Sequence, residues 1–239
     1  MAILTAVDGL VIDAQGPVLS ATLAAPNGNQ ISSVMADALI TVLTTPPAGA
    51  HLLVLRAVGD AFCLGRDRAA TDPGSLSVEV DRLVRLNQAL SQTSLVTIAE
   101  VHGDAAGFGA GLVALADVSV AVASAGFWFP EVGLGLAPTL VLAWLERAVG
   151  RREAFWLSAT GERISATRAQ QLGLLNDVVP DQRALSDVIE QRVGALLPRS
   201  PRVHAEIKSM LRAASGLNPE QANELAASRL VVGSLRLGH

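Results

Sequence analysis

The chain has 239 residues, enough for one sizeable domain, and half of them are hydrophobic. The net charge is −4, and Lys208 is the single lysine of the sequence. Because the sequence also shows no basic stripe, a nucleic-acid binder is not expected. No run of about twenty apolar residues lacks a charge or a Gly/Pro break, so no membrane span is predicted. Residues 1–13 lack the basic region of a signal peptide, and a single cysteine, Cys63, excludes an internal disulfide, so we expect a cytoplasmic protein.

Two kinds of apolar pattern predict the elements along the chain. Alternating or nearly continuous apolar runs predict strands, the continuous ones being typical of burial on both faces: residues 18–23, 51–56, 94–101 and 118–123. Helical spacing predicts helices: residues 34–43, 76–90, 112–116, 139–149, 152–159 and 165–172, and two or three more in the last fifty or so residues. Ser32 or Ser33 and Ser165 are expected N-caps. Strands come first and helices later, which indicates an α/β core with a helical C-terminal part.

Three loops next to these strands hold the residues best suited to chemistry: residues 59–67, 102–111 and 127–135. Loops at the ends of buried strands are where α/β proteins bind ligands. Glycines in the second loop let a ligand approach backbone N–H groups, and the helix after it adds partial positive charge. That combination suits a developing oxyanion. Glu131 in the third loop follows a proline and lies in an apolar neighbourhood, which suits a general base.

Each feature taken alone also has a simpler interpretation. Gly-rich turns usually serve tight packing, and residues 107–111 do not continue into a dinucleotide fingerprint, which fails at Leu112. An isolated Glu131 is more often a solvated loop residue. Cys63 is more often a small buried hydrophobe than a nucleophile, and His102 more often a hydrogen-bonded turn residue than a base.

Taken together and in order, five segments resemble the sequence elements of the crotonase superfamily, the enoyl-CoA hydratases and isomerases. The resemblance covers nearly the whole chain, and the segments are residues 62–67, 101–109, Asp117, 127–135 and 171–179. It implies an α/β fold built as a crotonase-type spiral of ββα units. Residues 1–180 would form the core with an acyl-CoA site, and residues 181–239 a helical trimerisation region. The partners implied are an acyl-CoA and further copies of the chain, as a homotrimer or a dimer of trimers.

The resemblance also implies a site. In this family two backbone amides hold the thioester carbonyl, and at the matching positions here they belong to Arg66 and Phe108. The hydratases carry two glutamates, whose positions here are Gly111 and Glu131, so one glutamate is missing. Further residues expected to contact the substrate are Ala61, Cys63, Leu64, Gly65, Asp67, Gly107, Gly109, Gly111, Pro130 and Leu134.

The missing glutamate bears on the reaction. Hydration shares the activation of water between two carboxylates, whereas a double-bond shift needs one base that takes a proton from C2 and returns it at C4. We therefore expect an enoyl-CoA isomerase in preference to a hydratase. The alternatives are a hydratase with an atypical site, for which Asp104 is near in sequence, and a non-catalytic acyl-CoA binder with Phe108, Trp128 and Phe129 around the chain. No metal or redox cofactor is expected, because the thioester itself acidifies the α-carbon.

Overall fold

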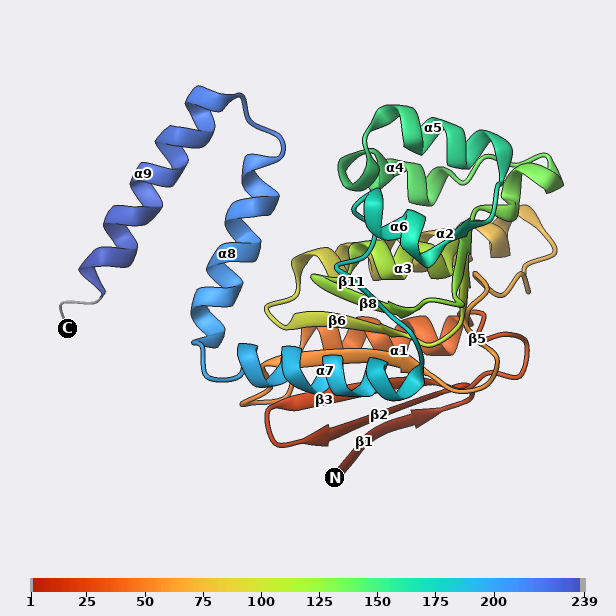
Figure 1. Cartoon of the computed structure of the whole chain (residues 1–239), viewed down its shortest axis with the longest axis horizontal. Helices are drawn as coiled ribbons and strands as arrows, with labels where there is room; N and C mark the ends of the chain where they lie inside the picture. Colours follow the sequence, from red (N-terminus) through yellow and green to blue (C-terminus); the bar gives the residue numbers. More distant parts are fainter. Residues whose placement is uncertain (1, 237–239) are drawn as a thin grey trace.

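The computed structural model describes residues 2–236 as two β-sheets with helices packed around them (Figure 1). The larger sheet has seven strands in the order β1-β2-β3-β4-β6-β8-β11: β1 (Ala2–Val7), β2 (Leu10–Gln15), β3 (Val18–Leu23), β4 (Leu52–Ala57), β6 (Val96–Val101), β8 (Val118–Val122) and β11 (Asp177–Val179). Strands β1 to β3 are antiparallel neighbours, and from β3 to β11 the pairing is parallel. The four strands predicted from apolar runs are confirmed as β3, β4, β6 and β8.

The smaller sheet has the order β10-β9-β7-β5. Its strands have two or three residues each: β5 (Ala61–Cys63), β7 (Asp104–Ala106), β9 (Gly126–Trp128) and β10 (Ile164–Ser165). The sequence patterns did not predict these strands, because so few residues carry no periodicity. The three predicted loops contribute β5, β7 and β9, so hydrogen bonding between short strands joins the loops to one another.

The helices of the described chain are α1 (Ser33–Thr44), α2 (Pro73–Gln92), α3 (Phe108–Leu115), α4 (Thr139–Val149), α5 (Arg151–Thr160), α6 (Ala166–Gln171), α7 (Gln182–Leu196), α8 (Pro201–Ala214), α9 (Pro219–Leu235) and a 3-10 turn, η1 (Pro130–Leu134). The predicted N-caps are confirmed: Ser32 caps α1 and Ser165 caps α6 through their hydroxyls. Helix α3 begins at Phe108 and not at residue 112, because packing against β5 overrides the low helix propensity of its glycines.

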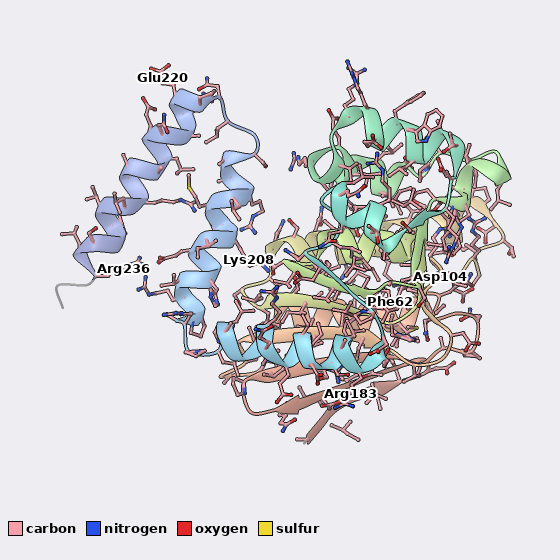
Figure 2. The ribbon with its side chains drawn as sticks, in the orientation of Figure 1. Phe62, Asp104, Arg183, Lys208, Glu220 and Arg236 are labelled. Carbon is pink, nitrogen blue, oxygen red and sulfur yellow. The ribbon has the colours of Figure 1, made fainter. Side chains whose placement is uncertain are left out.

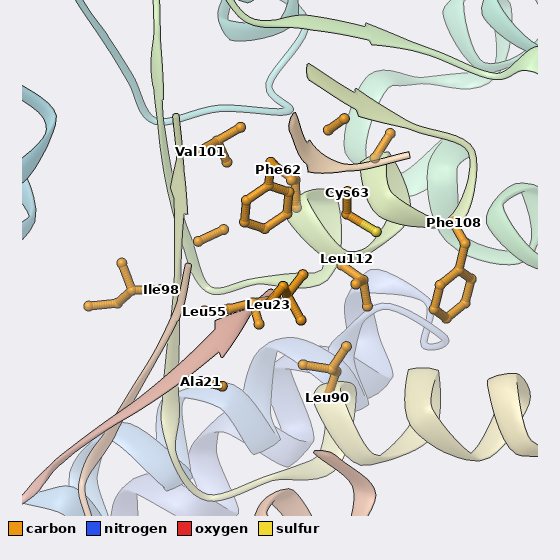
Figure 3. Close-up of a cluster of buried hydrophobic side chains, with 14 of the residues drawn as sticks. Ala21, Leu23, Leu55, Phe62, Cys63, Leu90, Ile98, Val101, Phe108 and Leu112 are labelled. Carbon is orange, nitrogen blue, oxygen red and sulfur yellow. The ribbon is translucent and has the colours of Figure 1, made fainter. Parts of the chain in front are cut away.

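The core connects the two sheets through β5 and α3. Figure 3 shows Phe62 and Cys63 of β5 among Val101, Leu112 and other apolar side chains. Phe62 and Cys63 are both inaccessible to solvent. Burying a large apolar side chain contributes about 1.5–3 kcal/mol. This packing fixes the elements that lead into Arg66 and Phe108.

The C-terminal helices divide into two groups. Helix α7 packs on the larger sheet and buries Leu185 and Ile189, although it falls within the region after residue 180 that the sequence assigns to assembly. Helix α8 lies along the side of the body, and α9 lies on the far side of α8 (Figure 1). None of the helices between residues 2 and 236 is long and apolar enough to cross a membrane.

Helix α8 turns a polar stripe toward the body. His204, Lys208 and Arg212 are four residues apart and therefore share one face of the helix. His204 Nδ1 lies 2.8 Å from Nε2 of the buried His51. Lys208, labelled on α8 in Figure 2, donates from its Nζ to Asp117 Oδ2 at 2.5 Å. The helix is thus attached to the core by hydrogen bonds and an ion pair.

Candidate active site

The small sheet and α3 bring the first two loops together. Cys63 of β5 pairs with Ala105 of β7, and α3 follows β7 almost directly. Gly109 lies so close to β5 that an added Cβ would be 2.0 Å from the Cys63 carbonyl oxygen. Glycine at this position is therefore a packing requirement, and it holds the start of α3 against the segment that leads into Arg66.

Two backbone amides at this junction have no acceptor between residues 2 and 236. Around Arg66, the Ile31 amide donates to the Gly65 carbonyl at 3.0 Å and the Asp67 amide donates to the Ile31 carbonyl at 2.9 Å. The Arg66 amide therefore points away from Ile31. Phe108 is the first residue of α3, so no carbonyl within the helix accepts from its amide. Free amide donors of this kind suit a carbonyl oxygen that gains negative charge.

Glu131 supplies a carboxylate beside these amides. It follows Pro130 in η1, and Gly107 leaves room for it, because a Cβ on Gly107 would lie 2.6 Å from Glu131 Oε1. Gly107 also has a φ of +51°, a conformation that side chains disfavour. Glu131 Oε2 is buried and has no hydrogen-bond partner within the described chain. A buried carboxylate oxygen without a partner calls for an explanation, and proton transfer to a bound molecule is one.

A single pocket of about 270 Å³ joins these groups. It is lined by Arg66, Phe108 and Glu131. The other walls come from the loop before α2, from α2 itself, from the segment between η1 and α4 and from the first turn of α4: Arg68, Leu76, Val80, Leu136, Ala137, Pro138, Thr139, Leu140 and Val141. Mostly apolar walls with a few convergent polar groups are typical of a small-molecule site.

The Arg66 side chain forms an ion pair at the edge of this pocket. Its Nη1 donates to Oε1 of Glu79 on α2, and Glu79 Oε2 accepts from the Ala70 amide at 3.2 Å. Burial lowers the pKa of the Arg66 guanidinium, the neighbouring Arg68 lowers it further, and Glu131 opposes both. Arg66 thus brings a charge as well as an amide to the pocket, and Glu79 holds that charge in place.

The space beside Gly111 is occupied by α4. A Cβ on Gly111 would lie 3.2 Å from Cζ2 of Trp144 and 3.4 Å from Cγ2 of Val141. The indole fills the side of α3 from which a longer residue at this position would project. No carboxylate other than that of Glu131 lines the pocket in the described chain.

Asp104 points away from the pocket. Its Oδ1 accepts from the Gly126 amide at 2.7 Å and from Nη2 of Arg163 at 2.6 Å. These bonds hold the carboxylate against β9 and the segment before β10. The position of Asp104 therefore gives no support to the hypothesis that it acts as a second carboxylate.

The other residues predicted to contact the substrate support the loops, and their side chains do not line the described pocket: Ala61, Cys63, Leu64, Gly65, Asp67, Gly107, Gly109, Gly111, Pro130 and Leu134. Burial raises the pKa of the Cys63 thiol to about 12, as expected for a buried hydrophobe and not for a nucleophile. Leu134 is 60% exposed, and Leu136 lines the pocket instead. Contacts through the backbone of these residues stay predictions.

Several other residues singled out in the sequence have structural contacts. His102 Nε2 lies 2.8 Å from the Gly59 carbonyl oxygen, which fits a hydrogen-bonded turn residue. Asp117 Oδ2 accepts from the amide and the hydroxyl of Thr97. Trp128 lines a separate hollow, and Phe129 is buried, so of the three aromatic residues considered for a binder only Phe108 reaches the pocket.

Sequence reasoning missed the far wall of the pocket. Arg68, Leu76 and Val80 lie in or before α2, where helical spacing indicated only an ordinary amphipathic helix. Trp144 was likewise missed, because in the sequence it is one residue of the apolar pattern that predicts α4. The one available signal was the run of charges Arg66, Asp67 and Arg68 directly after a predicted ligand loop.

Two amides without an acceptor in the described chain and one carboxylate thus meet at one small pocket, an arrangement that suits a carbonyl compound and proton transfer beside it. Comparison with known proteins gives the family. The family model described as enoyl-CoA hydratase/isomerase matches residues 13–233. The chain belongs to this family, which is part of the crotonase superfamily.

Individual relatives agree with that assignment. A putative enoyl-CoA hydratase of Thermus thermophilus is 32% identical over 209 residues, which are 83% of this chain and 81% of that protein. A probable enoyl-CoA hydratase of Rhodobacter capsulatus is 34% identical over 157 residues, and the match spans 61% of its length. The solved enoyl-CoA hydratase of Mycobacterium smegmatis superposes with a TM-score of 0.88 at 30% identity, covering 94% of this chain and 90% of that one.

Proposed function

We propose that this protein shifts the double bond of an enoyl-CoA, with Glu131 as its single proton-transferring base. The observation that carries the proposal is the packing beside Gly111. A side chain at position 111 would project against Trp144 and Val141, and Glu131 is the carboxylate that lines the pocket in the described chain. One base suffices for a double-bond shift, whereas hydration also needs a positioned water.

The proposed steps use groups that converge on the pocket. The thioester oxygen accepts hydrogen bonds from the Arg66 and Phe108 amides. Glu131 removes a proton from C2, and the electron pair moves into the thioester to form an enolate, whose charge the two amides stabilise by about two to three orders of magnitude per donor. The electrons then return through the conjugated system, C4 receives the proton from Glu131, and the double bond ends between C2 and C3. The proposal requires no cofactor.

The names of the relatives point to more than one reaction. Besides the hydratases, a 1,2-epoxyphenylacetyl-CoA isomerase of Escherichia coli is 34% identical over 147 residues. That match spans 58% of this chain and 56% of that protein. The family therefore supports an acyl-CoA enzyme, and the choice of isomerisation rests on the contents of the pocket.

The test is an assay of the pure protein with a 3-enoyl-CoA and with a 2-enoyl-CoA. We expect the 3-enoyl-CoA to be converted and the Glu131→Gln variant to lose about 10²–10⁴-fold in kcat. Glu146→Gln, on the exposed face of α4, is the matched control and should keep wild-type activity. Full activity of Glu131→Gln would refute the mechanism.

The same assay decides between the alternatives. If the protein converts the conjugated 2-enoyl-CoA into a hydroxyacyl-CoA and does not convert the 3-enoyl-CoA, it is a hydratase with an atypical site. Tight binding of acyl-CoA with no turnover of either compound would show a non-catalytic binder. The buried and unpartnered Glu131 Oε2 favours turnover over simple binding, because holding a thioester does not need it.

We also propose that further copies of the chain cover α8 and α9, in a trimer or a pair of trimers. A stripe of α8 next to the polar one is apolar and exposed: Val203, Ile207 and Leu211 are 39%, 50% and 69% exposed. On α9, Leu230 and Leu235 are 71% and 67% exposed. Exposed apolar patches of this kind usually mark interaction sites.

Light scattering tests this assembly. We expect a mass of about three or six chains for the wild type and a smaller particle for Leu211→Asp. Val58→Asp, at an exposed apolar residue next to β4, is the control and should leave the mass unchanged. A monomeric wild type would contradict the proposed assembly.

A further inference from the structure

The charges around the pocket are unevenly paired. Arg66 is bound to Glu79, which is itself buried and fixed by the Ala70 amide. Arg68 lines the same pocket but forms no ion pair or hydrogen bond with any residue between 2 and 236. Its proximity to Arg66 is sufficient to lower the pKa of that guanidinium. Besides the Arg66–Glu79 pair, the pocket thus contains a cation, Arg68, and a carboxylate, Glu131, that form no ion pair within residues 2–236.

An alkyl chain makes no use of such a group. Leu76 and Val80 would suffice to enclose a hydrocarbon, and the exposed Arg68 guanidinium gains no partner from such a chain. A carboxylate, in contrast, matches the planar donor fork of arginine and can accept two parallel hydrogen bonds from it. The positive charge of Arg68 at this wall therefore favours a substrate whose acyl group carries a negative charge.

The size of the pocket indicates which part of the substrate lies there. Its volume of about 270 Å³ is just below the usual range for small-molecule sites, roughly 300–1,000 Å³. A short acyl group fits this space, whereas the nucleotide and pantetheine parts of coenzyme A do not. An anion that reaches Arg68 inside the pocket is therefore more readily supplied by the acyl end than by the coenzyme A phosphates.

We propose that Arg68 is a specificity-determining residue that binds a carboxylate at the far end of a short acyl chain. The substrate class is then a monothioester of an unsaturated dicarboxylic acid with coenzyme A. This inference rests on the proposed function for the reacting end of the substrate, since the thioester must sit on the Arg66 and Phe108 amides. It adds a second anchor to the same pocket.

Turnover of two matched substrates tests the proposal. A 3-enoyl-CoA that ends in a carboxylate is compared with one of equal chain length that ends in a methyl group. We expect the wild type to have the higher kcat/KM with the carboxylated substrate. Arg68→Gln should lose about 10- to 100-fold on that substrate, as for a hydrogen bond to a charged group, and change less than about threefold on the neutral one. Arg68→Lys should lose less, because it keeps the charge but not the fork.

A binding arm separates this proposal from the reaction itself. Calorimetry with adipyl-CoA and hexanoyl-CoA, which are saturated and do not react, measures the anchor without turnover. We expect tighter binding of adipyl-CoA by the wild type and equal binding of both by Arg68→Gln. That result would stand even if neither enoyl-CoA were turned over, in which case only the proposed reaction would fail.

Two controls complete the design. Arg183→Gln, on the exposed side of α7 away from the pocket, should behave as the wild type in every arm (Figure 2). Thioesters of dephospho-CoA test whether the cation serves the nucleotide. Equal losses by Arg68→Gln on both acyl chains, or losses that disappear with dephospho-CoA, would overturn the proposal, and so would equal binding of adipyl-CoA and hexanoyl-CoA by the wild type.

Discussion

Replacing Gly109 by alanine should displace one of the two amides while leaving the chemical groups intact. The new Cβ would lie 2.0 Å from the Cys63 carbonyl oxygen, whereas a carbon–oxygen contact needs about 3.3 Å. The start of α3 must therefore move by about 1.3 Å relative to β5. The Phe108 amide moves with it, and a donor must lie about 2.7–3.1 Å from the oxyanion to stabilise it.

A displacement of this size has two measurable consequences. A misplacement of about 1 Å in an active site can cost about 10²-fold in rate, so we expect kcat to fall by about that factor. Overpacking costs about 1–3 kcal/mol, which for a chain of this length lowers Tm by roughly 2–12 °C. The assay is enoyl-CoA turnover at a temperature where circular dichroism shows the variant to be folded.

The matched control is Gly194→Ala. An added Cβ at Gly194 meets nothing within 4 Å, and the residue lies on the exposed side of α7. Alanine there should leave kcat unchanged and stabilise the helix by up to about 1 kcal/mol. Wild-type kcat together with wild-type Tm in Gly109→Ala would refute the reasoning about the junction of β5 and α3.

The remaining predictions concern a thiol, a histidine pair and a lysine. Because burial raises the pKa of Cys63 to about 12, iodoacetamide at about pH 8 should label it only after denaturation, and mass spectrometry showing equal rates would contradict this. Burial and then His204 lower the pKa of His51, so the unfolded chain binds more protons as the pH falls through about 6.5. The free energy of unfolding should therefore decrease below that pH, and thermal melts should show a flatter dependence in His51→Gln. Lys208→Met leaves Asp117 without its ammonium partner and should cost about 1–3 kcal/mol in urea unfolding; an unchanged midpoint would show that α8 does not depend on this ion pair.

The central strands and most helices could be predicted because they are long enough to show a period. Strands β4 and β6 are continuous apolar runs, and Ser32 and Ser165 mark the starts of their helices. Strands β5, β7 and β9 were missed as strands and found as loops, because their pairing depends on contacts between segments distant in sequence. Such contacts leave no local pattern.

The candidate site could be predicted only in part, for a related reason. Order and spacing of motifs placed Arg66, Phe108 and Glu131 together, and all three line one pocket. The contribution of Arg68 and the position of Trp144 follow from how α2 and α4 approach α3, which one sequence does not reveal. The side chain that lies beside Gly111 could not be predicted from the sequence, because Trp144 is far from Gly111 along the chain and contacts it only in the folded structure.

The contact between Gly111 and Trp144 has a consequence for how such a protein can evolve. Glutamate at position 111 meets the indole at once, since even its Cβ would be 3.2 Å from Cζ2. A smaller residue at position 144, without that glutamate, loses the packing of the partly buried indole against α3, a loss below the roughly 3–5 kcal/mol of a fully buried tryptophan. Either substitution alone is unfavourable, whereas a glutamate at position 111 has room when the residue at position 144 is smaller. The effects of the two substitutions on stability are therefore coupled. A lineage that acquires this tryptophan is therefore separated from a two-carboxylate site by a barrier that selection on single substitutions does not readily cross.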